Sequence, residues 1–112
     1  MNGMVDSLKH IRASSGDPVA PDDIAAAVTA GRLSYADGAS QVFESTGTTT
    51  YTEQGRESHG EWYVDDSGRF CSFWPPSYRA CYDLRWVVED GTIVGLTFIE
   101  LGRGSSFEGR YQ

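Results

Sequence analysis

Three polar side chains stand two positions apart in one segment, in a pattern that could bind a divalent metal ion. Glu57, His59 and Glu61 would project from one face of an extended strand, and carboxylates and imidazole are common ligands of such ions. Trp62 would point to the opposite face, which places the three in solvent, where polar residues are ordinary. Because three ligands from a single strand rarely enclose an ion, a metal-dependent enzyme built on these residues is our alternative hypothesis.

The two cysteines, Cys71 and Cys81, bracket an aromatic segment with two adjacent prolines. Proline prevents regular strand pairing, so the chain is expected to turn between the cysteines. A turn centred on Pro76 would place Cys71 opposite Cys81 and Arg69 opposite Asp83, which predicts a hairpin disulfide beside an exposed ion pair. Two reduced thiols are the alternative in a reducing compartment, and two cysteines alone make a poor zinc site.

The sequence contains no arrangement typical of covalent catalysis or phosphate binding. No serine lies in a nucleophile-elbow context, and neither cysteine has a histidine nearby in the sequence. Gly102-Arg103-Gly104 precedes a predicted strand instead of a helix, which argues against a phosphate-binding loop. We therefore favour a protein that is not an enzyme and needs no cofactor.

From Tyr35 onward, short β-rich runs alternate with glycine-containing turns roughly every 8 to 12 residues, which is typical of an antiparallel meander. About seven strands of this kind are expected to curl into a small lipocalin-like barrel, in which the last strand pairs near the first. A β-sandwich is the alternative fold. The predicted strands are 39–44, 48–53, 57–64, 69–74, 80–89, 92–101 and 106–112.

Two turns predict the registers of their hairpins. Asp66-Ser67-Gly68 fits a three-residue loop and would place Trp62 opposite Ser72 and Gly60 opposite Trp74. Each indole would then face a very small residue, as close cross-strand packing requires.

Asp90-Gly91 fits a two-residue turn and would place Trp86 opposite Gly95 in the same way. Together, the two registers predict that all three tryptophans are buried on one face of the sheet.

The predicted strand 92–101 is apolar on both faces. We expect one set of side chains to serve the interior and the other to face outward. Since exposed apolar patches usually mark contact sites, the outer set is expected to be covered by the N-terminal helices and by a second copy of the chain in a two-fold homodimer. The inner set is Ile93, Ile99 and Leu101, and the outer set is Val94, Leu96 and Phe98.

Residues 1–32 are expected to be a helical segment that packs on the 35–112 meander within a single domain. Apolar residues at near-helical spacing predict a short helix within 1–13. A second helix is expected to start at Pro21 and to bury Ile24, Ala27 and Val28, with Gly31 at its end.

Aromatic residues supply most of the expected barrel interior. In a larger barrel they would form a pocket for a small apolar ligand, but in a barrel of this length we expect the rings to fill the middle. The set consists of five candidate ligand contacts, Tyr51, Trp62, Trp74, Tyr82 and Trp86, together with Phe43, Phe70 and Phe107.

Charge and hydropathy exclude some partners. The 16 acidic and 9 basic residues give a net charge of −7, which argues against nucleic acid and anionic membranes as partners. No run of about 18 apolar residues predicts a membrane span. The first residues lack the features of a secretory signal, so a cytoplasmic protein is expected, unless a Cys71–Cys81 disulfide indicates export.

Several short motifs resemble a family of small bacterial proteins of unknown function. Gly60-Glu61-Trp62, Cys71-Ser72-Phe73-Trp74 and Cys81 are similar to the G-x-W … C-x-x-W … C pattern of that family, and the resemblance covers about residues 33–112. It implies an all-β domain, relatives that are often exported, and no established activity. Our first functional hypothesis is therefore a binding or interaction module for a small apolar ligand or a protein partner.

Overall fold

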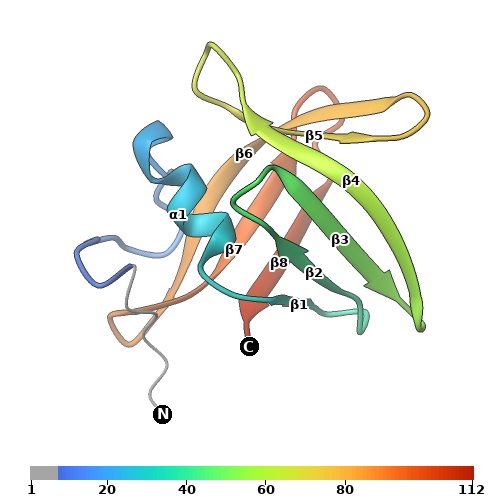
Figure 1. Cartoon of the computed structure of the whole chain (residues 1–112). Coiled ribbons are helices and arrows are strands. Elements are labelled where there is room, and N and C mark those ends of the chain that lie inside the picture. The colour runs from blue at the N-terminus through green and yellow to red at the C-terminus, as the bar shows by residue number, and fades with distance from the viewer. Residues whose placement is uncertain (1–7) are drawn as a thin grey trace.

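A computed structural model describes residues 8–112 of the chain, and its eight strands form a closed antiparallel barrel (Figure 1). Each strand pairs with the next one in the sequence, and β1 pairs with β8 to close the barrel. The prediction of a mainly-β barrel is therefore confirmed over the alternative of a β-sandwich. The strands are β1 (Leu33–Tyr35), β2 (Ser40–Phe43), β3 (Thr48–Glu53), β4 (Arg56–Val64), β5 (Phe70–Trp74), β6 (Tyr78–Glu89), β7 (Thr92–Glu100) and β8 (Ser106–Tyr111).

All seven predicted strands are present, and β1 is the strand that the sequence pattern did not indicate. It has only three residues, which is too short for a visible alternation of apolar and polar side chains. Its position is nevertheless decisive, because Leu33 pairs with Gln41 of β2 on one side and with Tyr111 of β8 on the other.

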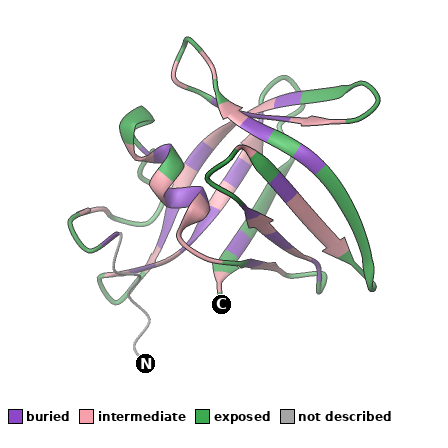
Figure 2. Ribbon diagram, viewed as in Figure 1, coloured by how far each residue is buried: buried purple, intermediate pink, exposed green. Residues whose placement is uncertain are grey.

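The register predicted for the first hairpin is confirmed. Trp62 of β4 lies opposite Ser72 of β5, and the indole of Trp74 covers Gly60. Figure 2 shows exposed and buried residues alternating from His59 to Trp62 of β4, after an exposed first half, as expected where one face of the strand lies inside a barrel. Trp62 and Trp86 are buried, at 8% and 3% exposure, whereas Trp74 is half-buried.

The register predicted for the second hairpin is wrong beyond its first pairs. Val88 lies opposite Ile93 as predicted, but a β-bulge then shifts the pairing, so that Gly95 faces Val87 and not Trp86. The bulge leaves Val94 as an extra residue in β7.

This bulge also reverses the predicted faces of β7. Leu96 and Phe98, which were expected to face outward, are buried in the barrel at 0% and 4% exposure. Ile99 is half-buried, and Leu101 lies beyond the end of β7 at 39% exposure. Ile93 is buried as expected, because the extra residue brings it onto the same face as Leu96. Two of the three residues of the apolar outer stripe that suggested a homodimer through strand 92–101 are therefore interior, and Val94 is half-buried.

The N-terminal segment covers the barrel differently from the prediction. Residues 9–13 form a turn and an irregular stretch instead of the predicted helix, Leu8 before them is helical and buried, and residues 1–7 of the prediction lie outside the described residues. Residues 16–19 then run along β6, where Asp17 accepts a hydrogen bond from the Trp86 amide and Val19 donates one to the Leu84 carbonyl.

The second predicted helix is confirmed as a 3₁₀ turn, η2 (Pro21–Asp23), that continues into α1 (Ile24–Thr29). Ile24, Ala27 and Val28 are buried, and they join Trp86 and Leu96 of the barrel in one hydrophobic cluster. This cluster closes one end of the barrel. Among the described residues, no helix is long and apolar enough to cross a membrane.

Candidate ligand-binding pocket

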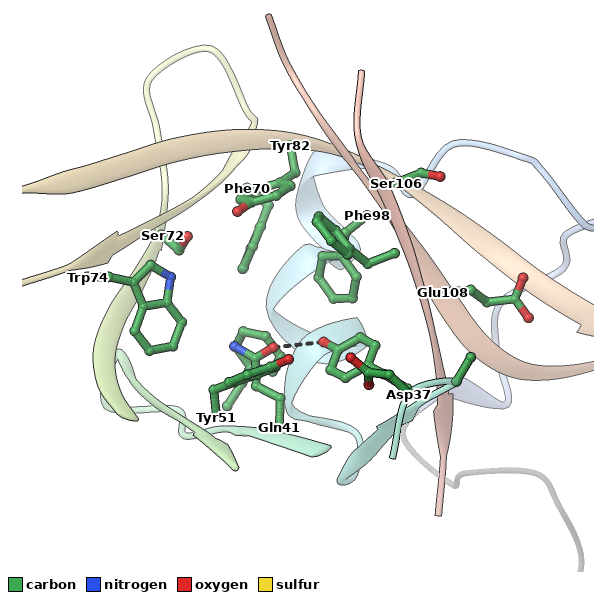
Figure 3. Close-up of a pocket in the computed structure, with 14 residues that line it drawn as sticks. Asp37, Gln41, Tyr51, Phe70, Ser72, Trp74, Tyr82, Phe98, Ser106 and Glu108 are labelled. Carbon is green, nitrogen blue, oxygen red and sulfur yellow. Dashed lines mark hydrogen bonds between the residues drawn. The ribbon is translucent and has the colours of Figure 1, made fainter. Parts of the chain in front are cut away.

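The other end of the barrel holds a cavity of about 520 Å³. Figure 3 shows the lining residues with α1 behind them, so the cavity opens at the end of the barrel that the helix does not cover. Most of the wall is aromatic. The aromatic lining residues are Tyr35, Phe43, Tyr51, Phe70, Trp74, Tyr82, Phe98 and Phe107.

Phe98 on β7 lies at the centre of the aromatic contacts that form the floor of the cavity. Its ring centroid is 5.7 Å from that of Phe70, 6.1 Å from that of Phe43 and 6.3 Å from that of Tyr82. These rings are supplied by four different strands, so the closed barrel holds the floor from several sides.

Two glycines make room for the rings of the wall. A Cβ atom at Gly60 would lie 2.6 Å from Cε3 of Trp74, and a Cβ atom at Gly109 would lie 3.0 Å from Cε1 of Tyr35. The first distance is shorter than real Cβ contacts and the second is tighter than most of them, so each ring comes close to a neighbouring strand because the residue there has no side chain.

A chain of hydrogen bonds fixes the polar part of the wall. The Tyr35 hydroxyl donates to Oε1 of Gln41 at 2.7 Å, and Nε2 of Gln41 donates to Oγ1 of Thr49 at 2.9 Å. The Thr49 hydroxyl in turn donates to the Val42 carbonyl at 2.8 Å. Gln41 and Thr49 are buried, and the chain supplies partners for their side chains, as buried polar groups require.

The tyrosines around the cavity are held in their neutral form. Burial raises the pKa of the Tyr35 hydroxyl, with smaller contributions from neighbouring Tyr51, Tyr82 and Asp37. Burial also raises the pKa of Tyr51, where the nearby Asp37 carboxylate adds to the effect. The pKa of Tyr82 is raised by burial as well, and a hydrogen bond with Ser72 opposes that shift. The pocket therefore presents neutral hydroxyls near a negative charge at its mouth.

Three of the five predicted ligand contacts line the cavity: Tyr51, Trp74 and Tyr82. Trp62 and Trp86 instead belong to the packed core, where the Trp62 indole N–H donates to the Glu44 carbonyl at 2.8 Å. The expectation that the rings fill the middle of the barrel thus holds for the end near α1, whereas the open end keeps a cavity.

The other expected interior residues divide in the same way. Phe43 and Phe70 are buried as predicted, but Phe107 lies at the mouth of the cavity and is 49% exposed.

Sequence reasoning missed three important pocket residues. Phe98 was assigned to the outer face because no sequence signal marked the bulge in β7. Tyr35 lies in the unpredicted strand β1, and Gln41 is a polar residue whose burial depends on its partners Tyr35 and Thr49. The alternation of Gln41 with Phe43 along β2 was the one available signal.

The predicted metal ligands do not converge on one point. Glu57, His59 and Glu61 are all exposed on the outer face of β4, with Nε2 of His59 at 3.7 Å from Oε1 of Glu57. Within residues 8–112, the one group of three potential ligand atoms lying within 4.8 Å of one another belongs to Asp65, Cys71 and Cys81. Its two sulfur atoms are bonded to each other.

The predicted disulfide is present between Cys71 and Cys81, which lie directly opposite each other on β5 and β6. The predicted ion pair beside it is wrong. Arg69 instead pairs with Asp65 at 3.3 Å, in the connection between β4 and β5. Asp83 pairs with Arg85 at 3.1 Å, two positions along the same strand. Hydrogen bonds from the Arg69 and Ser67 amides lower the pKa of Asp65.

Comparisons of the chain with protein-family models, with curated proteins and with solved structures gave no match. The resemblance noted in the sequence stays a prediction.

Proposed function

We propose that this protein is a non-enzymatic binding module that takes a small, largely apolar ligand into the open end of its barrel. The observation that supports this function is the cavity of about 520 Å³ with mainly aromatic walls. Pockets for small organic ligands typically enclose roughly 300–1,000 Å³ and combine apolar walls with a few fixed polar groups.

The interior of an eight-stranded barrel can be filled by side chains or can hold one small ligand, and this barrel keeps a cavity at its open end. An unfilled cavity forfeits van der Waals contacts and weakens the fold. The wall residues are nevertheless held in place by neighbouring strands and by the Tyr35–Gln41–Thr49 hydrogen bonds. A pocket built in this way is preorganised, so a ligand would recover the lost contacts without a large cost in ordering side chains.

Titration with N-phenyl-1-naphthylamine, a neutral probe whose fluorescence rises in apolar sites, tests this function. We expect saturable binding to one site, and Trp74→Ala should weaken it about tenfold because one wall of the pocket is removed. Phe73→Ala is the matched control, since Phe73 is the adjacent residue of β5 and its ring stacks under Arg79 outside the cavity.

Equal weakening by both substitutions, or an absence of saturable binding to the unaltered protein, would contradict the proposed function. Circular dichroism of each variant establishes that the barrel is still folded. Native mass spectrometry of the purified protein would then show whether a small molecule is retained from the host.

The disulfide supports the inference that the protein works in an oxidising compartment. Disulfides such as Cys71–Cys81 persist mainly outside reducing compartments, so we infer that the protein binds its ligand in an extracytoplasmic setting. Alkylation of the protein in freshly lysed cells, followed by mass measurement, would contradict this inference if both cysteines were modified.

A further inference from the structure

We propose that the ligand of this pocket is an organic cation, with an ammonium group that lies at the mouth and an apolar body that lies on the aromatic floor. The inference rests on the proposed function, because it concerns the same pocket. It follows from three features of the described wall: its aromatic faces, its charge and the direction of its hydrogen bonds.

Aromatic rings lie close together along one side of the cavity. The rings of Tyr35 and Tyr51 have centroids 6.2 Å apart and planes inclined by 44°, and Figure 3 shows Trp74 beside Tyr51 on the same side of the open space. The face of a tyrosine or tryptophan ring attracts a cation, most strongly when water is displaced. An ammonium group at this position would meet several such faces.

The charge of the lining is negative. Its two charged residues are both acidic, Asp37 and Glu108. Arg110 engages the Glu108 carboxylate at 3.0 Å, and Figure 3 shows that carboxylate directed away from the cavity. The Asp37 carboxylate therefore supplies the effective charge, and its Oδ1 atom is held by the Ala39 amide at 3.0 Å.

The hydrogen bond of Tyr35 leaves an acceptor for the ligand. The Tyr35 hydroxyl commits its proton to Gln41, so only its oxygen lone pair is available to a bound molecule. A ligand that carries protons or positive charge is complementary to this oxygen and to Asp37.

An anionic ligand such as a fatty acid is the opposite case. No lysine, arginine or histidine is among the described residues that line the cavity, so a bound carboxylate would lose its water near Asp37 without gaining a cationic partner. Such an unpaired, partly buried charge is strongly unfavourable.

Displacement of N-phenyl-1-naphthylamine by three molecules of similar shape tests the proposal. Phenyltrimethylammonium carries a positive charge, tert-butylbenzene is its neutral counterpart, and benzenesulfonate carries a negative charge. We expect the cation to bind at least about tenfold more tightly than the anion, because attraction to the rings and to Asp37 is replaced by repulsion and desolvation.

Asp37→Asn sharpens the test because asparagine keeps the oxygen that accepts the Ala39 amide while removing the charge. We expect about three- to fivefold weaker binding of the cation, tighter binding of the anion and unchanged binding of tert-butylbenzene. Asp66→Asn is the matched control, since Asp66 lies in the exposed loop between β4 and β5 and not in the cavity wall.

The outcomes separate the two proposals. If the neutral probe binds but the anion displaces it as well as the cation does, or if Asp37→Asn and Asp66→Asn act alike, the cation proposal is overturned and the binding function stands. If neither the probe nor any of the three molecules binds, both proposals are overturned.

Discussion

Gly60 lies directly under the indole ring of Trp74, and a Cβ atom there would also come within 2.7 Å of the Phe73 carbonyl oxygen. A methyl group at this position must displace a ring, a strand backbone or both. The same closeness that shapes the pocket wall thus makes this glycine sensitive to the smallest substitution.

We predict that Gly60→Ala destabilises the protein by ~1–3 kcal/mol, the usual cost of overpacking, and weakens binding of the neutral probe. Thermal and denaturant unfolding measure the first effect. Gly31→Ala is the control, because a Cβ atom at Gly31 would meet its nearest neighbour, Cδ1 of Tyr111, at an ordinary 3.7 Å. Equal stability of the two variants would contradict the packing argument.

At the scale of elements, β7 shows where sequence reasoning succeeds and where it stops. Glycine turns predicted the register of the β4–β5 hairpin and the first pairs of the β6–β7 hairpin, because turn type and strand register are linked by local geometry. The bulge at Val94 has no such local signal, and one extra residue was enough to reverse the faces assigned to Leu96 and Phe98. The short strand β1 was missed for a related reason, since pairing with β8 and β2 defines it more than its own residues do.

The residues of the candidate site also divide into those that a local sequence pattern predicted and those that it missed. Tyr82 was predicted from the alternation along its strand and Trp74 from the register of its hairpin, Tyr51 was included as an interior aromatic, and all three line the cavity. Whether a barrel interior is filled or hollow depends on how side chains from distant strands meet, which a local pattern does not specify.

The bulge gives Gly95 a role that differs from the predicted one. A Cβ atom at Gly95 would lie 2.1 Å from the Gly109 carbonyl oxygen of β8 and not against Trp86. We predict that Gly95→Ala separates β7 from β8 and lowers stability by more than about 2 kcal/mol, or prevents folding.

A Trp86→Phe substitution distinguishes the two explanations for Gly95. If Gly95 only made room for the indole, the smaller ring of Trp86→Phe would rescue Gly95→Ala. Because the contact is with backbone of β8, we expect no rescue in thermal unfolding of the double variant.

The disulfide joins β5 to β6 across a hairpin with a sequence separation of 10 residues. Closure of a loop of this length should stabilise the fold by about 2–3 kcal/mol through the unfolded state. We predict that the double variant C71S/C81S has a lower unfolding midpoint and the same barrel by circular dichroism. An unchanged midpoint would show that the bond contributes no net stability.

At the scale of the whole molecule, the barrel is closed twice: laterally by the pairing of β1 with β8, and at one end by α1. Tyr111 connects the two closures, since it lies on β8 opposite Leu33 and its hydroxyl donates to the Ala27 carbonyl of α1 at 2.5 Å. The open end is left as the way into the pocket, and Tyr35 lies in its wall.

These two tyrosines predict how the whole protein responds to alkaline pH. Burial raises the pKa of both Tyr111 and Tyr35 in the folded state, whereas a tyrosine in the unfolded chain has a pKa of about 10. The folded state then retains protons that the unfolded state releases, so the stabilising contribution is complete below about pH 10 and is lost as the pH rises above it. The free energy of unfolding should therefore fall steeply above about pH 10.

We expect Tyr111→Phe and Tyr35→Phe to be less stable near neutral pH, because each removes a hydrogen bond worth about 1 kcal/mol. Each variant should also lose stability less steeply in alkali. Tyr63→Phe, on the outward face of β4 where Arg79 donates to the hydroxyl, is the control for removal of one tyrosine. Urea unfolding between pH 7 and 11.5 measures the slopes, and identical slopes for Tyr111→Phe and Tyr63→Phe would contradict the assignment of the alkaline transition to buried tyrosines.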